Sequence, residues 1–127
     1  MEIDLSRVLC ALDDIPVDGA RGFVAGQGDC PLRGLLVRTR GGVHAYVNRC
    51  PHAGHGLNLR PHEFLTPDGS LILCHSHGAL FEKSTGTCVA GPCAGRALTA
   101  VPVRIEAGFV LLADGVEAAS FEHVEAV

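Results

Sequence analysis

The stretch that decides the fold is Leu-Arg-Gly-Leu-Leu-Val-Arg-Thr-Arg-Gly-Gly-Val-His-Ala-Tyr-Val, residues 32–47. Two runs rich in apolar residues, 32–38 and 43–47, flank a charged turn that ends in Gly41-Gly42. This pattern predicts a β-hairpin, because glycine adopts the backbone conformations that a tight turn between antiparallel strands requires. Two apolar strands joined by a short turn therefore form the expected centre of the fold.

Similar short runs, separated by turn residues, occur elsewhere in the chain. The sequence predicts further strands at 8–12, 20–25, 70–73 and 79–81, and a second hairpin within 100–112. No segment keeps apolar residues at the i, i+3, i+4, i+7 spacing for the roughly ten residues expected of a stable helix. We therefore expect an all-β fold built from antiparallel sheets.

The composition is that of an ordinary globular domain. The chain has 127 residues, of which 47% are hydrophobic and 19% charged, so we predict one domain spanning 1–127. A net charge of −4 argues against nucleic acid, whose binding needs clustered basic residues. The longest apolar runs are far shorter than the ~20 residues that cross a bilayer, and the N-terminus carries no export signal. We expect a cytoplasmic protein without a membrane partner.

Two short clusters each combine a thiol with an imidazole. They are Cys50-Pro51-His52 and Cys74-His75-Ser76-His77. Both lie in a loop-rich segment, about 48–96, where a bound metal centre would supply the rigidity that a small apolar core cannot. In a reducing compartment, cysteines at such spacings bind metal more often than they form disulfides.

This arrangement resembles the signature of Rieske iron–sulfur proteins. A Cys-x-His box and a Cys-x-x-His-Gly box with a later Phe are carried by Cys50, His52, Cys74, His77, Gly78 and Phe81. The similarity extends to Leu57, Thr85-Gly86, Gly91-Pro92 and the hairpin near 101–105, and covers about 43–112. The resemblance implies the Rieske fold, an antiparallel base with an inserted cluster-binding lobe at about 48–96.

The resemblance also implies a cofactor and its ligands. Cys50 and Cys74 would hold one iron of a [2Fe–2S] cluster, and His52 and His77 would hold the other. Two neutral imidazoles remove negative charge from one iron, so the reduction potential lies above that of an all-cysteine cluster. The outer ring nitrogens should hold protons more tightly after reduction, so the potential should fall at alkaline pH.

Several positions differ from those of high-potential members of the family. His55 and Ser76 stand where those members carry a pair of disulfide-forming cysteines. Ala79 and Phe81 stand where those members carry a Ser and a Tyr whose hydroxyls donate hydrogen bonds to sulfur. We therefore predict a potential toward the lower end of the Rieske range, near about −150 mV.

The function implied by the resemblance is one-electron transfer rather than catalysis. Rieske oxygenases hold a separate mononuclear iron in a much larger catalytic domain, which we do not expect here. A soluble ferredoxin that links a flavin-containing reductase to a terminal oxygenase fits best. Two alternatives stay open: a small subunit of a larger redox enzyme, similar to that of assimilatory nitrite reductase, and a module that senses loss of its cluster.

Other ligand-type residues have no place in the signature. Two Cys and two His also suit zinc, although structural zinc pairs are usually separated by two or more residues. We expect three histidines to be solvated or to lie behind the ligands: His55, His62 and His75. We expect most of the remaining cysteines to be buried thiols, with a redox-active Cys88–Cys93 pair as the alternative: Cys10, Cys30, Cys88 and Cys93.

Overall fold

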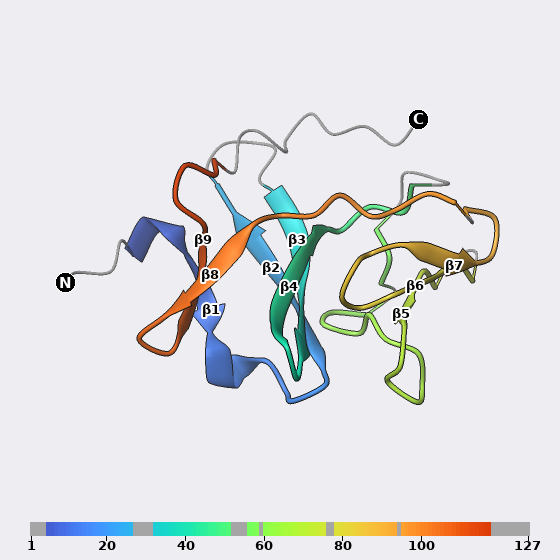
Figure 1. Ribbon diagram of the computed structural model, residues 1–127, viewed down its shortest axis with the longest axis horizontal. Coiled ribbons are helices and arrows are strands. Elements are labelled where there is room, and N and C mark those ends of the chain that lie inside the picture. The colour runs from blue at the N-terminus through green and yellow to red at the C-terminus, as the bar shows by residue number, and fades with distance from the viewer. Residues whose placement is uncertain are drawn as a thin grey trace.

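The computed structural model describes residues 5–26, 32–51, 56–58, 60–75, 78–93 and 95–117. Within these ranges, three antiparallel sheets of three strands each lie in a row (Figure 1). The helical elements described are two short 3-10 turns, η1 (Leu5–Arg7) and η2 (Leu12–Asp14). In the part of the chain that is described, no helix has the length and apolar character needed to cross a membrane. The predicted all-β class is confirmed.

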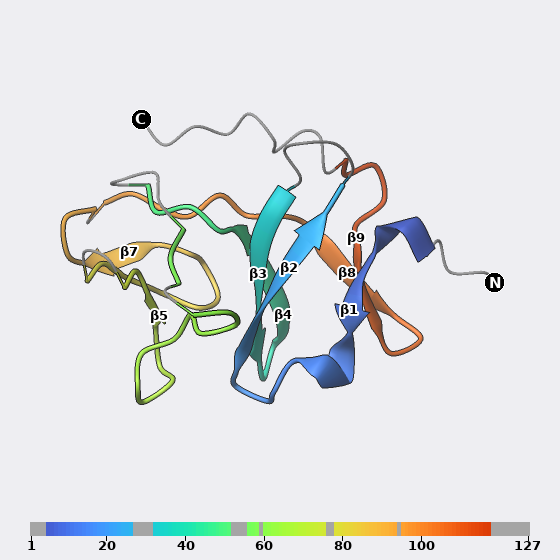
Figure 2. The ribbon, with the colours of Figure 1, turned by 180° about the vertical axis from the view of Figure 1, so that it is seen from behind.

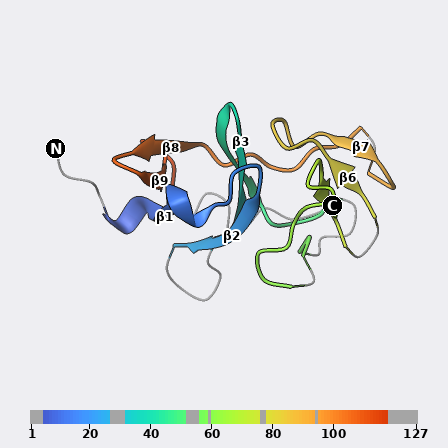
Figure 3. The same cartoon turned by 90° about the horizontal axis from the view of Figure 1, so that it is seen from below.

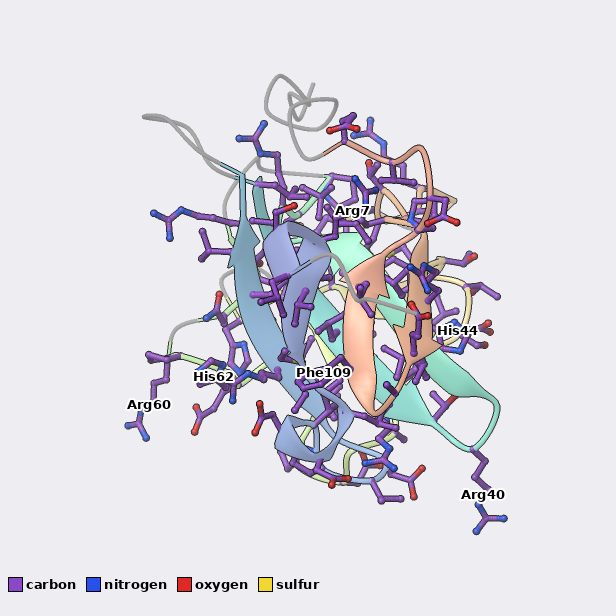
Figure 4. All side chains as sticks on the ribbon, turned by 90° about the vertical axis from the view of Figure 1, so that its left-hand side faces the viewer. Arg7, Arg40, His44, Arg60, His62 and Phe109 are labelled. Atoms are coloured by element: carbon purple, nitrogen blue, oxygen red, sulfur yellow. The ribbon has the colours of Figure 1, made fainter. Side chains whose placement is uncertain are left out.

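The central sheet contains β2 (Ala20–Ala25), β3 (Leu32–Thr39) and β4 (Gly42–Val47), in that order. Thr39 pairs with Gly42, so the predicted hairpin turns through the two residues between them. Figure 4 shows Arg40 projecting from this turn, away from the rest of the molecule. The hairpin predicted from residues 32–47 is confirmed.

The first sheet joins the two ends of the described chain. Its strands are β1 (Val8–Ala11), β8 (Val103–Glu106) and β9 (Phe109–Leu112), ordered β1-β9-β8. The second predicted hairpin, expected within 100–112, begins only at Val103, because the residues before it pair with β4 instead. The Val47 N–H donates to the Thr99 carbonyl and the Val101 N–H donates to the Ala45 carbonyl, both at 2.9 Å.

The third sheet is the smallest. It contains β5 (Ile72–Leu73), β6 (Leu80–Phe81) and β7 (Cys88–Ala90), in that order. Figures 2 and 3 show this sheet at the end of the molecule opposite β8 and β9. β5 and β6 fall within predicted strands, whereas β7 was not predicted.

The central sheet is buried on both faces. Alternate side chains of a strand point to opposite faces, so neighbouring residues of β3 enter different cores. Leu36 packs in an apolar core shared with Val110 and Leu112 of the first sheet. Its neighbours Leu35 and Val37 belong to a second core, shared with residues of the third sheet. The second core also contains four cysteines: Cys50, Cys74, Cys88 and Cys93.

Lys83 links the turn after β6 to the central sheet. The Tyr46 hydroxyl, on β4, donates to the Lys83 carbonyl at 2.8 Å. The Lys83 ammonium donates in turn to the Asp18 carbonyl at 2.8 Å, in the loop before β2. These contacts fix the third sheet against the central sheet.

Candidate metal centre

The first candidate ligand, Cys50, lies three residues after the end of β4. The strand stops at Val47, and the Asn48 N–H donates back to the Arg33 carbonyl at 2.9 Å. The Arg49 N–H donates to the Val47 carbonyl at 2.9 Å, which turns the chain inward. The Cys50 side chain is consequently 0% exposed.

The second candidate ligand, Cys74, follows β5 directly and is also 0% exposed. Two hydrogen bonds close the turn that it opens: the Cys74 N–H donates to the Ala79 carbonyl at 2.9 Å, and the Gly78 N–H donates to the Cys74 carbonyl at 2.8 Å. Gly78 has a φ of +73°, which glycine adopts at no steric cost. The chain therefore turns sharply after Cys74.

Asn48, Leu57 and His75 join the two loops. The Leu57 N–H donates to Asn48 Oδ1 at 2.7 Å, while Asn48 Nδ2 donates to Asn58 Oδ1 at 2.9 Å. The buried Leu57 then offers its carbonyl to the His75 N–H at 2.9 Å. This chain of contacts holds the end of the first box beside the start of the second. Our sequence interpretation missed Asn48; the available signal was an amide residue between a strand end and the first cysteine.

A third loop covers the turn that Cys74 opens. Gly91, just after β7, has a φ of +93°, and a Cβ placed there would lie 2.8 Å from the Ala79 Cα. Only glycine permits such a close approach of the two backbones. At the far end of this loop, Arg96 Nη1 donates to the Pro51 carbonyl at 3.0 Å. The loop therefore contacts both boxes, through Gly91 at the second and Arg96 at the first.

The described residues include only part of the predicted ligand set. Cys50 and Cys74 come together in one buried cluster. Five residues named in the sequence interpretation lie outside the described residues: Cys30, His52, His55, Ser76 and His77.

The structure accounts for two of the other histidines. His75 Nδ1 lies 3.1 Å from the Leu57 carbonyl oxygen, so a proton on Nδ1 makes it a donor there. His62 Nδ1 accepts from the Gly22 N–H at 3.1 Å, and His62 occupies a backbone with φ +65°. Figure 4 shows His62 and Arg60 on the same side of the molecule.

Cys10 lies in the core between the first and central sheets, apart from the other described cysteines. Burial raises the pKa of its thiol, and the nearby Arg21 charge opposes that effect. Cys10 is a free thiol, as the sequence interpretation expects.

The donor chemistry of the site fits an iron–sulfur cluster. Two soft sulfur donors from separate loops are fully buried in one apolar core, where an isolated thiolate would be costly. Iron ions would neutralise that charge, and thiolate sulfur is the donor that such clusters prefer. Ala79 and Phe81 are both fully buried beside them and offer no side-chain hydrogen-bond donor.

Comparison with known proteins agrees with this geometry. The profile of the Rieske [2Fe-2S] domain matches residues 7–108. Comparison with curated protein sequences gives no match.

Solved structures of similar fold include electron carriers. The chain is similar to the Sphingomonas yanoikuyae B1 ferredoxin, with 27% sequence identity and a TM-score of 0.60, over 83% of this chain and 94% of that one. It is similar to one chain of the complex of reduced oxygenase and oxidized ferredoxin in carbazole 1,9a-dioxygenase, with 25% identity and a TM-score of 0.63, over 87% and 94% of the two chains.

A much longer protein contains the same fold. The terminal oxygenase of carbazole 1,9a-dioxygenase from Novosphingobium sp. KA1 matches with 24% identity and a TM-score of 0.67, over 87% of this chain and 30% of that one. The fold, the buried cysteine pair and the match over residues 7–108 agree. The chain belongs to the Rieske [2Fe–2S] domain family.

Proposed function

We propose that this protein is a one-electron carrier, with its [2Fe–2S] cluster held by Cys50, Cys74, His52 and His77 in a lobe spanning about 48–96. The observation that carries the proposal is the pair of fully buried cysteines that two separate loops deliver to one core. When bound, the cluster supplies a one-electron couple whose mixed ligation sets its potential. The protein's own task is to hold the cluster and keep water from its sulfur atoms.

The positions of the two histidines support their place in the ligand set. His52 follows Cys50 by two residues, and His77 follows Cys74 by three. Leu57, five residues after His52, and Gly78, directly after His77, are fixed by hydrogen bonds from their N–H groups to Asn48 Oδ1 and the Cys74 carbonyl. Each box would thus contribute one sulfur and one nitrogen, so the bound cluster would also join the two loops.

The surface around the site supports exchange of electrons with another protein. The Val89 side chain of β7 is 46% exposed, and Pro92 in the covering loop is exposed. Exposed apolar side chains of this kind suit a transient contact with a partner.

The compared proteins support the choice of partners. This chain covers 94% of the Sphingomonas ferredoxin, but only 30% of the carbazole dioxygenase oxygenase. We propose that electrons enter from a flavin-containing reductase and leave to a terminal oxygenase. The described cysteines form no disulfide in this structure, which agrees with the reducing cytoplasm that we propose as the compartment of this protein.

The cluster assignment is tested on protein purified and reconstituted without oxygen. We expect iron and acid-labile sulfide in equal amounts, and a coloured protein whose absorption bleaches on reduction. Cys50→Ser should lose the colour, while Cys10→Ser, which changes a thiol in the other core, should keep it. A colourless protein that binds zinc would overturn the assignment.

The carrier role has its own test. The reconstituted protein should restore electron flow between a purified flavin reductase and a Rieske oxygenase, and should remain a separate small protein throughout. Purification from its source as a fixed component of a larger enzyme would contradict a shuttle, while leaving the cluster assignment intact.

A further inference from the structure

Cys88 and Cys93 stand at the two ends of the loop that covers the second box. Cys88 begins β7, and the chain reverses at Gly91 before reaching Cys93. The backbone of Arg96 bonds to both cysteines: its carbonyl accepts from the Cys88 N–H at 2.8 Å, and its N–H donates to the Cys93 carbonyl at 2.9 Å. The two cysteine backbones are therefore neighbours.

The side chains of the two cysteines also meet. Cys88 Sγ donates to the Ala90 carbonyl at 3.2 Å, and both cysteine side chains enter the same buried core. The two residues are only 4% and 1% exposed, in the same core as Cys50. Burial, the hydrogen bond to Cys88 and the nearby Cys88 and Cys50 sulfurs raise the pKa of the Cys93 thiol to about 12.

We propose that Cys88 and Cys93 form a thiol–disulfide couple, a second redox site beside the loop that carries Cys50. The oxidant is a low-molecular-weight disulfide of the glutathione type. The S–S bond of that disulfide breaks and the bond between the two cysteine sulfurs forms, through a mixed disulfide. Two electrons and two protons pass from the protein thiols to the two released small thiols, so no other reactant is needed.

The surroundings of the pair make this exchange feasible. The loop residues between the two cysteines are exposed or half-buried, so the sulfurs lie just beneath the surface. The backbone bonds of both cysteines to Arg96 and their shared core bring the two residues close to each other, as a bond of about 2.05 Å between their sulfurs requires. Because both thiols are buried, exchange is expected to be slow, and its equilibrium is the quantity to measure.

The sequence provides a direct assay. Lys83 and Arg96 are successive tryptic cleavage sites, and the peptide 84–96 contains Cys88 and Cys93 but no other cysteine. The cluster-loaded protein is equilibrated without oxygen in reduced and oxidised glutathione, quenched in acid, unfolded, alkylated and digested. We expect both cysteines of this peptide to escape alkylation together. The mass of the peptide should be lower by two hydrogen atoms than that of its unalkylated dithiol form. Excess reduced glutathione should reverse the change.

Two variants serve as controls. Cys10→Ser removes a thiol from the other core and should form the internal disulfide as the natural protein does. Cys88→Ser should leave Cys93 either alkylated or joined to glutathione, and the visible absorption of the cluster reports whether this variant still folds. In the natural protein, two thiols that remain alkylated at the oxidising limit, or that react with glutathione independently, would overturn the proposal. This readout does not depend on the carrier role.

Discussion

Replacement of Asn48 by Ala should loosen the link between the two boxes. The Asn48 side chain accepts the Leu57 N–H at 2.7 Å and donates to Asn58 Oδ1 at 2.9 Å. Leu57 is fully buried and Asn48 is half-buried, so the Leu57 amide would have only limited access to water once the acceptor is removed. The change therefore leaves a buried donor unsatisfied at the point where the first box meets the second.

The expected cost follows from these two contacts. A buried donor left without a partner costs about 1–3 kcal/mol, and the second hydrogen bond contributes about 1 kcal/mol. We expect Asn48→Ala to lower the free energy of unfolding by about 2–4 kcal/mol, and the melting temperature by roughly 10 °C. Because Leu57 also holds His75, we expect the variant to release iron faster than the natural protein.

The assay combines denaturant unfolding with the rate at which visible absorption is lost to an iron chelator. The matched control is Asn58→Ala, which removes the Asn48–Asn58 bond and the exposed bond from Asn58 Nδ2 to the Arg60 carbonyl but leaves the bond from the Leu57 N–H in place. This control should cost about 1 kcal/mol and should leave iron release nearly unchanged. Equal effects of the two substitutions, or a cost within about 0.5 kcal/mol of zero for Asn48→Ala, would refute the reasoning.

Three further predictions concern the same end of the molecule. Gly86→Ala should destabilise the protein by about 2 kcal/mol or more, because Gly86 has a φ of +74° and the new Cβ would lie 2.7 Å from Tyr46 Cε1. The control Gly108→Ala, with a φ of +83° and no atom within 4 Å, should cost only about 1 kcal/mol in chemical denaturation. Burial raises the pKa of Tyr46 to about 12, so the folded state keeps the phenol proton that the unfolded chain loses near pH 10. Stability should fall by about 2–3 kcal/mol between about pH 10 and pH 12, and Tyr46→Phe should remove that part of the decline; an unchanged alkaline limb would contradict this. Ala79→Ser should raise the midpoint potential, because a hydroxyl that favours the reduced cluster by about 1 kcal/mol corresponds to roughly 40 mV for one electron; a lower potential in redox titration would count against the proposed ligand geometry.

Local patterns predicted most of the strands. The hairpin at 32–47 followed from apolar runs around a glycine turn, and its strand pairing is confirmed. The pairing of β1 with β9 brings together residues about a hundred positions apart, and no local pattern reports such a contact. β7 was not predicted because its three residues lie between Gly86 and Gly91, in a segment that the sequence interpretation took as turns and loop.

Some residues of the site were likewise predicted from the sequence, whereas others became visible only in the structure. Cys50 and Cys74 were singled out because their residue types and spacing carry chemistry, and the fold places both in one core. Asn48 escaped notice because its role depends on where Leu57 returns in space, which spacing does not reveal. The contact between Cys88 and Cys93 likewise depends on the backbone of Arg96. Side chains that act through contacts made by folding need the structure.

The most direct test of the central claim is the electron spin resonance spectrum of the dithionite-reduced, reconstituted protein. Two sulfur and two nitrogen ligands should give one unpaired electron per chain, with an average g-value below that of a cluster held by four thiolates. A silent spectrum despite full reconstitution, or an average g-value typical of four thiolates, would contradict the assignment of Cys50, His52, Cys74 and His77 as the cluster ligands.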